Sequence, residues 1–289
     1  MNWFAQILLA SILALALPPP APAQQRVEVA RADGAKTPLR VFAAQNAQGC
    51  PPLALLSHGA GASEDRNLPY LATALSDDGW RVIAIGHAES GSAPMRDDIR
   101  AAGFKQGLID LVTDVHAYRA RFMDIDAALA WSQAQCRAPF KALIGHSMGA
   151  ITVMLAAGAR HKLDVGKGDA KFARAIDAFV ALSPEGPGVV FPDDAWQPIA
   201  APMLLVTGTR DGGLGGDYTW RIRAFEGLGP GCRALAVVDR ATHMNLGGLD
   251  PAHRVTSKVA PLVVQYLDGV RAGRCTQLIA PVGVMLRSK

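Results

Sequence analysis

Residues 140–149, Phe-Lys-Ala-Leu-Ile-Gly-His-Ser-Met-Gly, decide the fold of this chain. The stretch contains an apolar run typical of a buried strand, and the helix-favouring segment 150–159 follows directly after the second glycine. A strand, a sharp turn and a helix, with Ser147 at the apex between two glycines, match the G-x-S-x-G nucleophile elbow. Glycine is needed there because a Cβ atom two residues from the serine would collide with the neighbouring strand and helix. The pentapeptide also occurs by chance, so an ordinary βα turn that carries a serine is the alternative interpretation.

The rest of the chain places this turn in an alternation of strands and helices. From residue 53 onward, apolar runs suited to strands alternate with helix-like segments, which predicts a mostly parallel sheet with helices on both faces. Segments 26–30 and 39–44, on either side of Asp33-Gly34, predict an antiparallel edge hairpin. We expect eight strands, at residues 26–30, 39–44, 53–57, 81–85, 142–144, 178–182, 203–206 and 235–238.

Two connecting segments bear on access to a site at the carboxyl ends of these strands. Segment 86–118 is interrupted by glycines and a proline, so we expect it to be irregular and to wrap the rim. Segment 183–202 is short and contains five prolines, which leaves little room for helices. No large cap is therefore expected over the site.

The N-terminal segment has the features of a secretory signal peptide. Residues 5–17 form an apolar run too short to span a bilayer comfortably, prolines end it, and Ala21-Pro22-Ala23 supplies the small residues of a cleavage site. We expect cleavage after Ala23, export to the periplasm or the extracellular space, and one domain over residues 24–289 with no stable membrane insertion. The segment lacks lysine and arginine, so an uncleaved N-terminal anchor is the alternative.

Composition narrows the classes of partner. The net charge of +4 arises from 29 basic and 25 acidic side chains that are interspersed, which gives little support to nucleic-acid binding. The four cysteines, at positions 50, 136, 232 and 275, suit disulfides in an oxidising compartment, with three possible connectivities. No C-x-x-C or Cys/His ligand spacing is present, and the glycines after residue 58 lack the rest of a dinucleotide fingerprint. We expect no metal and no organic cofactor.

A serine nucleophile needs a histidine base held by a carboxylate. Asp211 follows the strand at 203–206, and His243 follows the strand at 235–238, so both are expected at the same edge of the sheet as Ser147. The order serine, acid, histidine along the chain suits an elbow of this kind. The rivals are Asp217, which could cap a helix, and Asp239 for the acid, and His87, His116, His161 and His253 for the base.

These residues give the chain a resemblance to a known family. Over roughly residues 26–271 it resembles the α/β-hydrolases, and more narrowly the dienelactone-hydrolase-like and platelet-activating-factor-acetylhydrolase-like serine esterases. The motifs that carry the resemblance are Ser-His-Gly-Ala-Gly at 57–61, Gly-His-Ser-Met-Gly at 145–149, Gly-Thr-Arg-Asp at 208–211 and Thr-His-Met at 242–244. The resemblance implies an α/β-hydrolase fold, with Ser147 as nucleophile, His243 as base and Asp211 as the orienting acid.

The oxyanion hole requires two backbone N–H groups aimed at the developing negative charge. Met148 follows the nucleophile at the start of a helix and should supply one of them. The family resemblance implies that Ala60, in the loop after the strand at 53–57, supplies the second. His58 and His146 are expected to pack beneath the loop and the elbow.

The implied fold also selects a disulfide pairing. It makes the strand that ends at His58 a neighbour of the strand that ends at Ser147, and Cys50 and Cys136 precede these two strands. Cys232 begins the last predicted strand, and Cys275 follows a closing helix expected at 255–270. We predict the pairs Cys50–Cys136 and Cys232–Cys275, both opposite the active site.

The function predicted from the sequence is hydrolysis of small-molecule carboxylic esters by an exported serine hydrolase. Without a large cap to line an acyl tunnel, short acyl groups should be preferred. Amide or peptide hydrolysis by the same residues, and a non-catalytic binding protein on this fold, are the alternatives.

Overall fold

A computed structural model describes residues 24–45, 47–165, 171–275 and 278–289. The signal peptide predicted at residues 1–23 lies outside these residues. The strands form a sheet in the order β1-β2-β4-β3-β5-β6-β7-β8-β9. Their bounds are β1 (Gln24–Ala30), β2 (Lys36–Phe42), β3 (Leu53–Ser57), β4 (Arg81–Ile85), β5 (Lys141–His146), β6 (Ala178–Leu182), β7 (Met203–Arg210), β8 (Arg233–Thr242) and β9 (Val284–Ser288).

The sheet is parallel through its centre and antiparallel at its edges. Strands β4, β3, β5, β6, β7 and β8 pair in parallel, whereas β1 and β2 at one edge and β9 at the other pair antiparallel. The expected α/β-hydrolase fold with a mostly parallel sheet is confirmed, but the sheet has nine strands instead of eight. The strand that was not predicted, β9, is a mostly exposed C-terminal edge strand whose apolar residues are only Val284, Met285 and Leu286.

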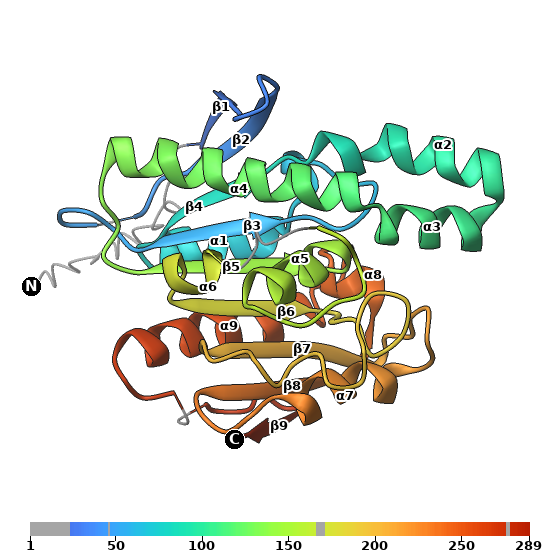
Figure 1. The fold of residues 1–289 in the computed structure, drawn as a ribbon. Coiled ribbons are helices and arrows are strands. Elements are labelled where there is room, and N and C mark those ends of the chain that lie inside the picture. The colour runs from blue at the N-terminus through green and yellow to red at the C-terminus, as the bar shows by residue number, and fades with distance from the viewer. Residues whose placement is uncertain (1–23, 46, 166–170, 276–277) are drawn as a thin grey trace, which may run out of the picture.

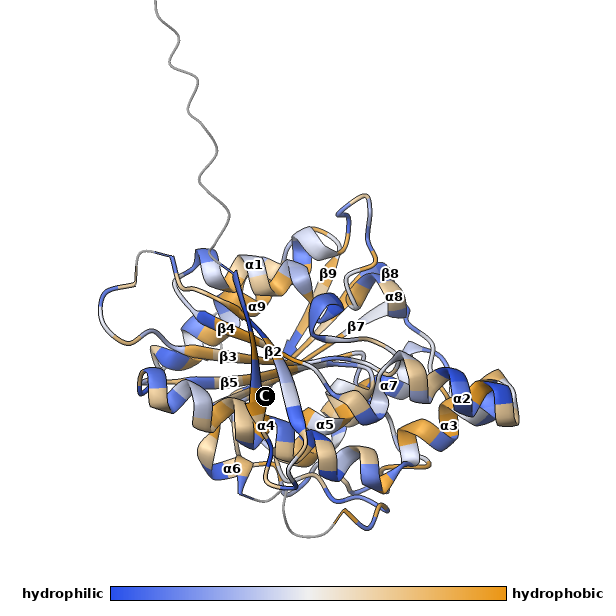
Figure 2. Cartoon of the chain, turned by 90° about the horizontal axis from the view of Figure 1, so that it is seen from above, coloured by the Kyte–Doolittle hydropathy of each residue, from blue (hydrophilic) through white to orange (hydrophobic). Residues whose placement is uncertain are grey.

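Helices cover both faces of the sheet, as expected. Their bounds are α1 (Pro69–Asp77), α2 (Ser92–Ala102), α3 (Phe104–Thr113), α4 (Val115–Gln135), α5 (Met148–Ala156), α6 (Phe172–Ala175), α7 (Tyr218–Gly227), α8 (His243–Leu246) and α9 (Thr256–Arg271), with short 3₁₀ turns η1 (Glu64–Arg66) and η2 (Ala88–Ser90). Helices α1 and α9 lie on one face, and α4, α5 and α6 lie on the other (Figure 2). Leu53 and Leu55 of β3 pack into one apolar core and Ala54 and Leu56 into the other, so this strand is buried on both sides.

The expectation that segment 86–118 is irregular was wrong. Helices α2 and α3 form a hairpin that projects from the molecule beside the carboxyl ends of the strands (Figure 1). Gly103 ends α2 with a positive φ of 80°. Gly107 lies within α3, where a Cβ atom would come within 2.5 Å of the Asp98 backbone, so this glycine permits close helix packing. The glycines that suggested a loop in fact shape a helical hairpin.

Segment 183–202, between β6 and β7, contains no helix, as expected from its prolines. Within the described ranges, no helix is long and apolar enough to cross a membrane.

Both predicted disulfides are confirmed. Cys50 is bonded to Cys136 and Cys232 to Cys275, with Cα–Cα distances of 5.7 and 5.3 Å. Cys50, Cys136 and Cys232 each lie shortly before a strand. They are therefore at the amino-terminal ends of the strands, opposite the carboxyl ends that carry Ser147 and Asp211.

Replacing Cys50 and Cys136 together by serine should lower the free energy of unfolding by about 2–4 kcal/mol. The matched Cys232/Cys275 pair should have a smaller effect, because it closes a loop of 43 residues instead of 86. Urea denaturation of the two double variants measures both values. Variants as stable as the wild type, or the opposite order, would contradict the stabilising role of these bridges.

Candidate active site

The elbow has the strained geometry that its sequence predicts. Ser147 has φ 57° and ψ −120°, between the end of β5 and the start of α5. A Cβ atom on Gly145 would lie 2.2 Å from the Gly149 carbonyl oxygen, and one on Gly149 would lie 2.0 Å from the Ser57 carbonyl oxygen. Both glycines are therefore required by close backbone packing, and the packing holds the serine in a conformation that costs energy.

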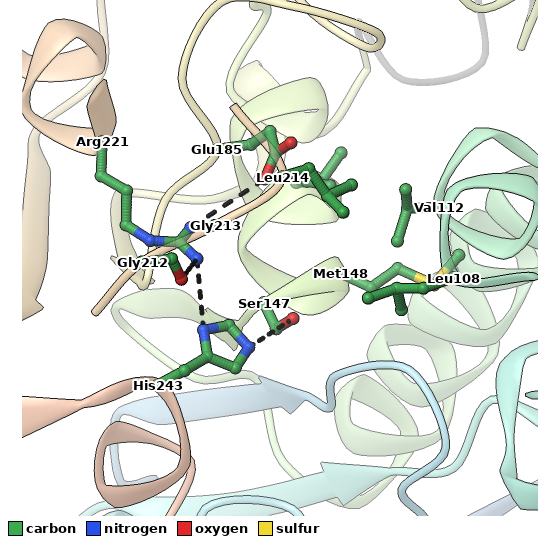
Figure 3. A pocket seen from close by; sticks show the side chains of 11 residues that line it. Leu108, Val112, Ser147, Met148, Glu185, Gly212, Gly213, Leu214, Arg221 and His243 are labelled. Carbon is green, nitrogen blue, oxygen red and sulfur yellow. Dashed lines mark hydrogen bonds and ion pairs between the residues drawn. The ribbon is translucent and has the colours of Figure 1, made fainter. Parts of the chain in front are cut away.

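The structure brings Ser147, His243 and Asp211 into one hydrogen-bonded chain. His243 Nε2 lies 3.0 Å from Ser147 Oγ, and His243 Nδ1 lies 3.0 Å from Asp211 Oδ1 (Figure 3 shows the serine and the histidine). A carboxylate can only accept, so Nδ1 carries the hydrogen and Nε2 is left free to accept from the serine hydroxyl. This is the arrangement that a general base requires.

Local structure holds the candidate base, His243, and the candidate acid, Asp211, in position. His243 is the first residue of α8, and Thr242 and Asn245 form a capping box around it. Asp211 follows β7 directly and is fully buried. His243 is partly exposed, so a substrate can reach the ring that Asp211 orients.

Arg221 is a residue of the candidate site that the sequence does not indicate. Its side chain is buried, with Nε 3.2 Å from Asp211 Oδ1. The guanidinium donates hydrogen bonds to the carbonyls of Asp211, Gly212, Ser183 and Pro184, at 2.9–3.0 Å. Arg221 thus ties the loop after β6 to the loop that carries the acid. In the sequence it is only one of several arginines, and no local pattern marks it.

Burial of Asp211 opposes its ionisation, but the hydrogen bond from His243 and the charge of Arg221 outweigh it. The pKa of Asp211 is consequently held below its usual value. The acid therefore stays ionised at neutral pH, ready to stabilise a protonated His243.

The residues expected to form the oxyanion hole, Met148 and Ala60, lie close to Ser147. Met148 is the first residue of α5, and the first N–H groups of a helix have no acceptor within it. The loop that carries Ala60 passes close to the elbow, because a Cβ atom on Gly59 would lie 3.1 Å from Ser147 Cβ. Met148 and Ala60 therefore remain the candidates for the two backbone donors.

A pocket of about 370 Å³ opens at Ser147 and His243 (Figure 3). Its walls are largely apolar. Helix α3 of the projecting hairpin contributes Leu108 and Val112, helix α5 contributes Met148 and Ile151, and the loop after β7 contributes Leu214. Glu185 and Arg221 form a polar part of the lining. Burial raises the pKa of Glu185 to about 7, although the nearby Arg221 works against this.

The comparisons with known proteins agree with this geometry. A model of the alpha/beta hydrolase family matches residues 54–283. The chain belongs to the α/β-hydrolase family.

Solved structures with the same fold include a dienelactone hydrolase, the protein Est1E and an esterase domain. A dienelactone hydrolase from Anabaena variabilis is 21% identical, with a TM-score of 0.53 over 85% of this chain and 96% of that chain. Est1E from Butyrivibrio proteoclasticus is 17% identical, with a TM-score of 0.57 over 83% and 98%. The esterase domain of a Rhodothermus marinus protein is 15% identical, with a TM-score of 0.53 over 86% and 99%. No curated protein matches the chain significantly.

The rival acids of the hydrolase are used elsewhere. Asp217 caps α7 and accepts a hydrogen bond from the Thr219 N–H at 2.9 Å, which confirms the cap role foreseen for it. Asp239 is exposed, pairs with Arg240 and accepts from the Thr209 hydroxyl.

The two histidines within the motifs, His58 and His146, are buried, as expected. His146 Nε2 lies 2.9 Å from the His243 carbonyl oxygen, so it can donate to the backbone that carries the base. Burial and the neighbouring His243 lower the pKa of His146 to about 3, which keeps it neutral. His58, at the start of the loop that carries Ala60, is also buried.

The hydrolase also contains a second Ser-His-Asp constellation. His87 Nε2 lies 2.9 Å from Ser57 Oγ, and His87 Nδ1 lies 2.8 Å from Asp124 Oδ2. The geometry is that of a catalytic triad, but the exposed fractions of Ser57, His87 and Asp124 are 0%, 2% and 1%. Ser147 lines the pocket, whereas Ser57 lies inside the protein. In the sequence, Ser57 ends a predicted strand and His87 lies in the segment expected to wrap the rim. No local pattern indicates that the two side chains meet.

Proposed function

We propose that this α/β-hydrolase is an exported serine esterase that cleaves small carboxylic esters through Ser147, His243 and Asp211. The observation that carries the proposal is the unbroken hydrogen-bonded chain from Asp211 to Ser147 at the base of an accessible pocket. The two disulfides support export, because disulfides persist mainly in oxidising compartments. Residues 24–289 would act as one catalytic domain.

The reaction follows from the positions of these groups. Ser147 Oγ attacks the ester carbonyl while His243 Nε2 takes the serine proton. The N–H groups of Met148 and Ala60 stabilise the oxyanion, and Asp211 stabilises the protonated histidine. His243 then gives its proton to the departing alcohol, which leaves an acyl-enzyme on Ser147. Water, activated by His243, attacks the acyl-enzyme and releases the acid and the free serine.

Direct assay of purified protein tests this proposal. Nitrophenyl acetate and butyrate should be hydrolysed with a kcat/KM far above that of the matched nitroanilides, since the alcohol is the better leaving group. Ser147→Ala protein supplies the background rate. Turnover of the anilides alone would contradict an esterase and favour an amidase.

Acyl groups from acetyl to butyryl should give a higher kcat/KM than dodecanoyl or longer groups, with no interfacial activation. A pocket of about 370 Å³ is near the lower end of the usual range for ligand sites, so a long chain would remain largely in water. Each methylene gains about 0.8 kcal/mol only where it is buried. Initial rates on a nitrophenyl ester series, measured below the critical micelle concentrations, check the order. A steady rise in kcat/KM with chain length would contradict it.

A further inference from the structure

The loop at residues 58–61, which carries Ala60, rests on a network of buried polar side chains. We call Ser57, His87, Ser90, Arg121 and Asp124 the buried polar network; each of them is at most 2% exposed. They come from β3, the turn after β4 and helix α4. Buried polar groups of this kind are costly unless they are hydrogen-bonded. The members of the network are bonded to one another and to the backbone, apart from one nitrogen of Arg121, Nη2, which has no partner among the described residues.

The direction of each hydrogen bond in the network is fixed. Asp124 only accepts, so His87 donates from Nδ1 and its Nε2 accepts from the Ser57 hydroxyl. Ser57 Oγ in turn accepts from Arg121 at 3.2 Å. Burial, followed by the charges of Arg121 and Arg31, holds the pKa of His87 well below its usual range, so the ring stays neutral. The chain of donors therefore runs one way, from Arg121 to Asp124.

Arg121 is the member that reaches the loop. Its Nη1 donates to the His58 carbonyl oxygen at 2.8 Å, at the start of the loop. Its Nε donates to Ser90 Oγ at 3.0 Å, and the Ser90 carbonyl accepts from the Gly61 N–H at 2.9 Å, at the end of the loop. One buried guanidinium is thus connected to both ends of a segment with Ala60 at its centre.

His58 stiffens the loop further. Its Nδ1 donates to the Gly59 carbonyl at 2.7 Å, and its Nε2 accepts from the His87 N–H at 2.9 Å. The far end of the network is held from outside the loop, because Asp124 Oδ1 accepts from Thr37 and from Arg31. The network joins the edge hairpin β1–β2 to the oxyanion loop.

We propose that Arg121 is a positioning residue of the oxyanion hole. It holds both ends of loop 58–61, so that the Ala60 N–H stays aimed at the carbonyl oxygen of a bound ester, and Ser57, His87 and Asp124 hold Arg121. The proposal rests on the esterase function proposed above. The second Ser-His-Asp constellation then has a role that requires burial, whereas a nucleophile would require access.

Three substitutions test the role at different strengths. Arg121→Lys keeps the charge but can make only some of the bonds of the guanidinium, and should lower kcat by about 10–100-fold; loss of a whole oxyanion donor costs about 10²–10³-fold. Ser57→Ala and Ser90→Ala each remove one acceptor of Arg121 and should lower kcat by about 3–10-fold. KM for nitrophenyl butyrate should stay within about threefold in all three, because ground-state binding does not need the oxyanion donor.

A transition-state analogue separates positioning from a merely structural role. A trifluoromethyl ketone analogue of the butyrate ester forms an oxyanion on Ser147, so its inhibition constant should rise in step with the fall in kcat. The inhibition constant of butyrate should not change. Ser76→Ala is the matched control, since Ser76 is fully buried in α1 and its hydroxyl donates to the Thr73 carbonyl at 2.9 Å, away from the loop. Ser76→Ala should leave kcat and the inhibition constants of the ketone and of butyrate unaltered.

The outcomes distinguish failure of the positioning role of Arg121 from failure of the proposed esterase function. If Arg121→Lys and Ser57→Ala keep kcat within twofold while the wild type hydrolyses esters through Ser147, the positioning role is overturned and the esterase stands. If kcat falls but the ketone binds as tightly as before, the role is also overturned. Should Arg121→Lys fail to fold, Ser57→Ala and Ser90→Ala decide by the same criteria. A wild type that hydrolyses no ester overturns both proposals.

Discussion

Ser147→Ala should abolish ester hydrolysis and leave the fold intact. Loss of the nucleophile from a serine triad lowers kcat by about 10⁴-fold or more. Without the serine hydroxyl no acyl-enzyme can form, and only the oxyanion hole and substrate binding still contribute to the rate. Stability should change little, since His243, which is partly exposed, is the one partner of the Ser147 hydroxyl among the described residues, and alanine must adopt the same positive φ of 57°. The comparison is kcat on nitrophenyl butyrate, with thermal unfolding measured on the same preparations. Retention of more than about a tenth of the wild-type kcat would contradict the assignment.

Asp211→Asn should lower kcat by about 10⁴-fold. The carboxylate accepts from His243 Nδ1 and thereby leaves Nε2 free to accept the serine proton. An asparagine amide can donate to Nδ1 and so favour the other tautomer, in which Nε2 carries the hydrogen and cannot act as the base. The substitution also leaves the buried Arg221 without its nearest counter-charge.

Asp217→Asn is the matched control for this prediction. Asp217 is an aspartate six residues further along the chain that caps α7, and asparagine is an equally good cap, so activity and stability should both be nearly unchanged. A large loss of kcat in Asp217→Asn with little effect in Asp211→Asn would mean that the wrong carboxylate has been assigned.

The parts of the fold that the sequence predicts are those with local signals. The central strands have continuous apolar runs because both of their faces are buried, and the elbow needs two glycines within five residues. Ser147, Asp211 and His243 each follow such a strand, so their meeting follows from parallel topology.

The missed parts depend on contacts that are distant in the sequence. Gly107 indicates a chain break by propensity, but its role is to let α3 approach the Asp98 backbone. Arg121 and Ser57 are 64 residues apart, and His87 and Asp124 are 37 apart, so no local pattern could show the buried polar network. Arg221 is recognisable only once the loops after β6 and β7 lie side by side.

Ser147, and not the buried Ser57, is the proposed nucleophile. The most direct test is to treat the folded protein with a fluorophosphonate, then reduce it, digest it with trypsin and locate the adduct by mass spectrometry. The two serines fall in different peptides, because Ser147 is the only serine between Lys141 and Arg160, and Ser57 lies between Arg40 and Arg66. We expect one adduct per chain, on the 142–160 peptide, and none in Ser147→Ala. An adduct on the 41–66 peptide, or an unreactive wild type, would contradict the account.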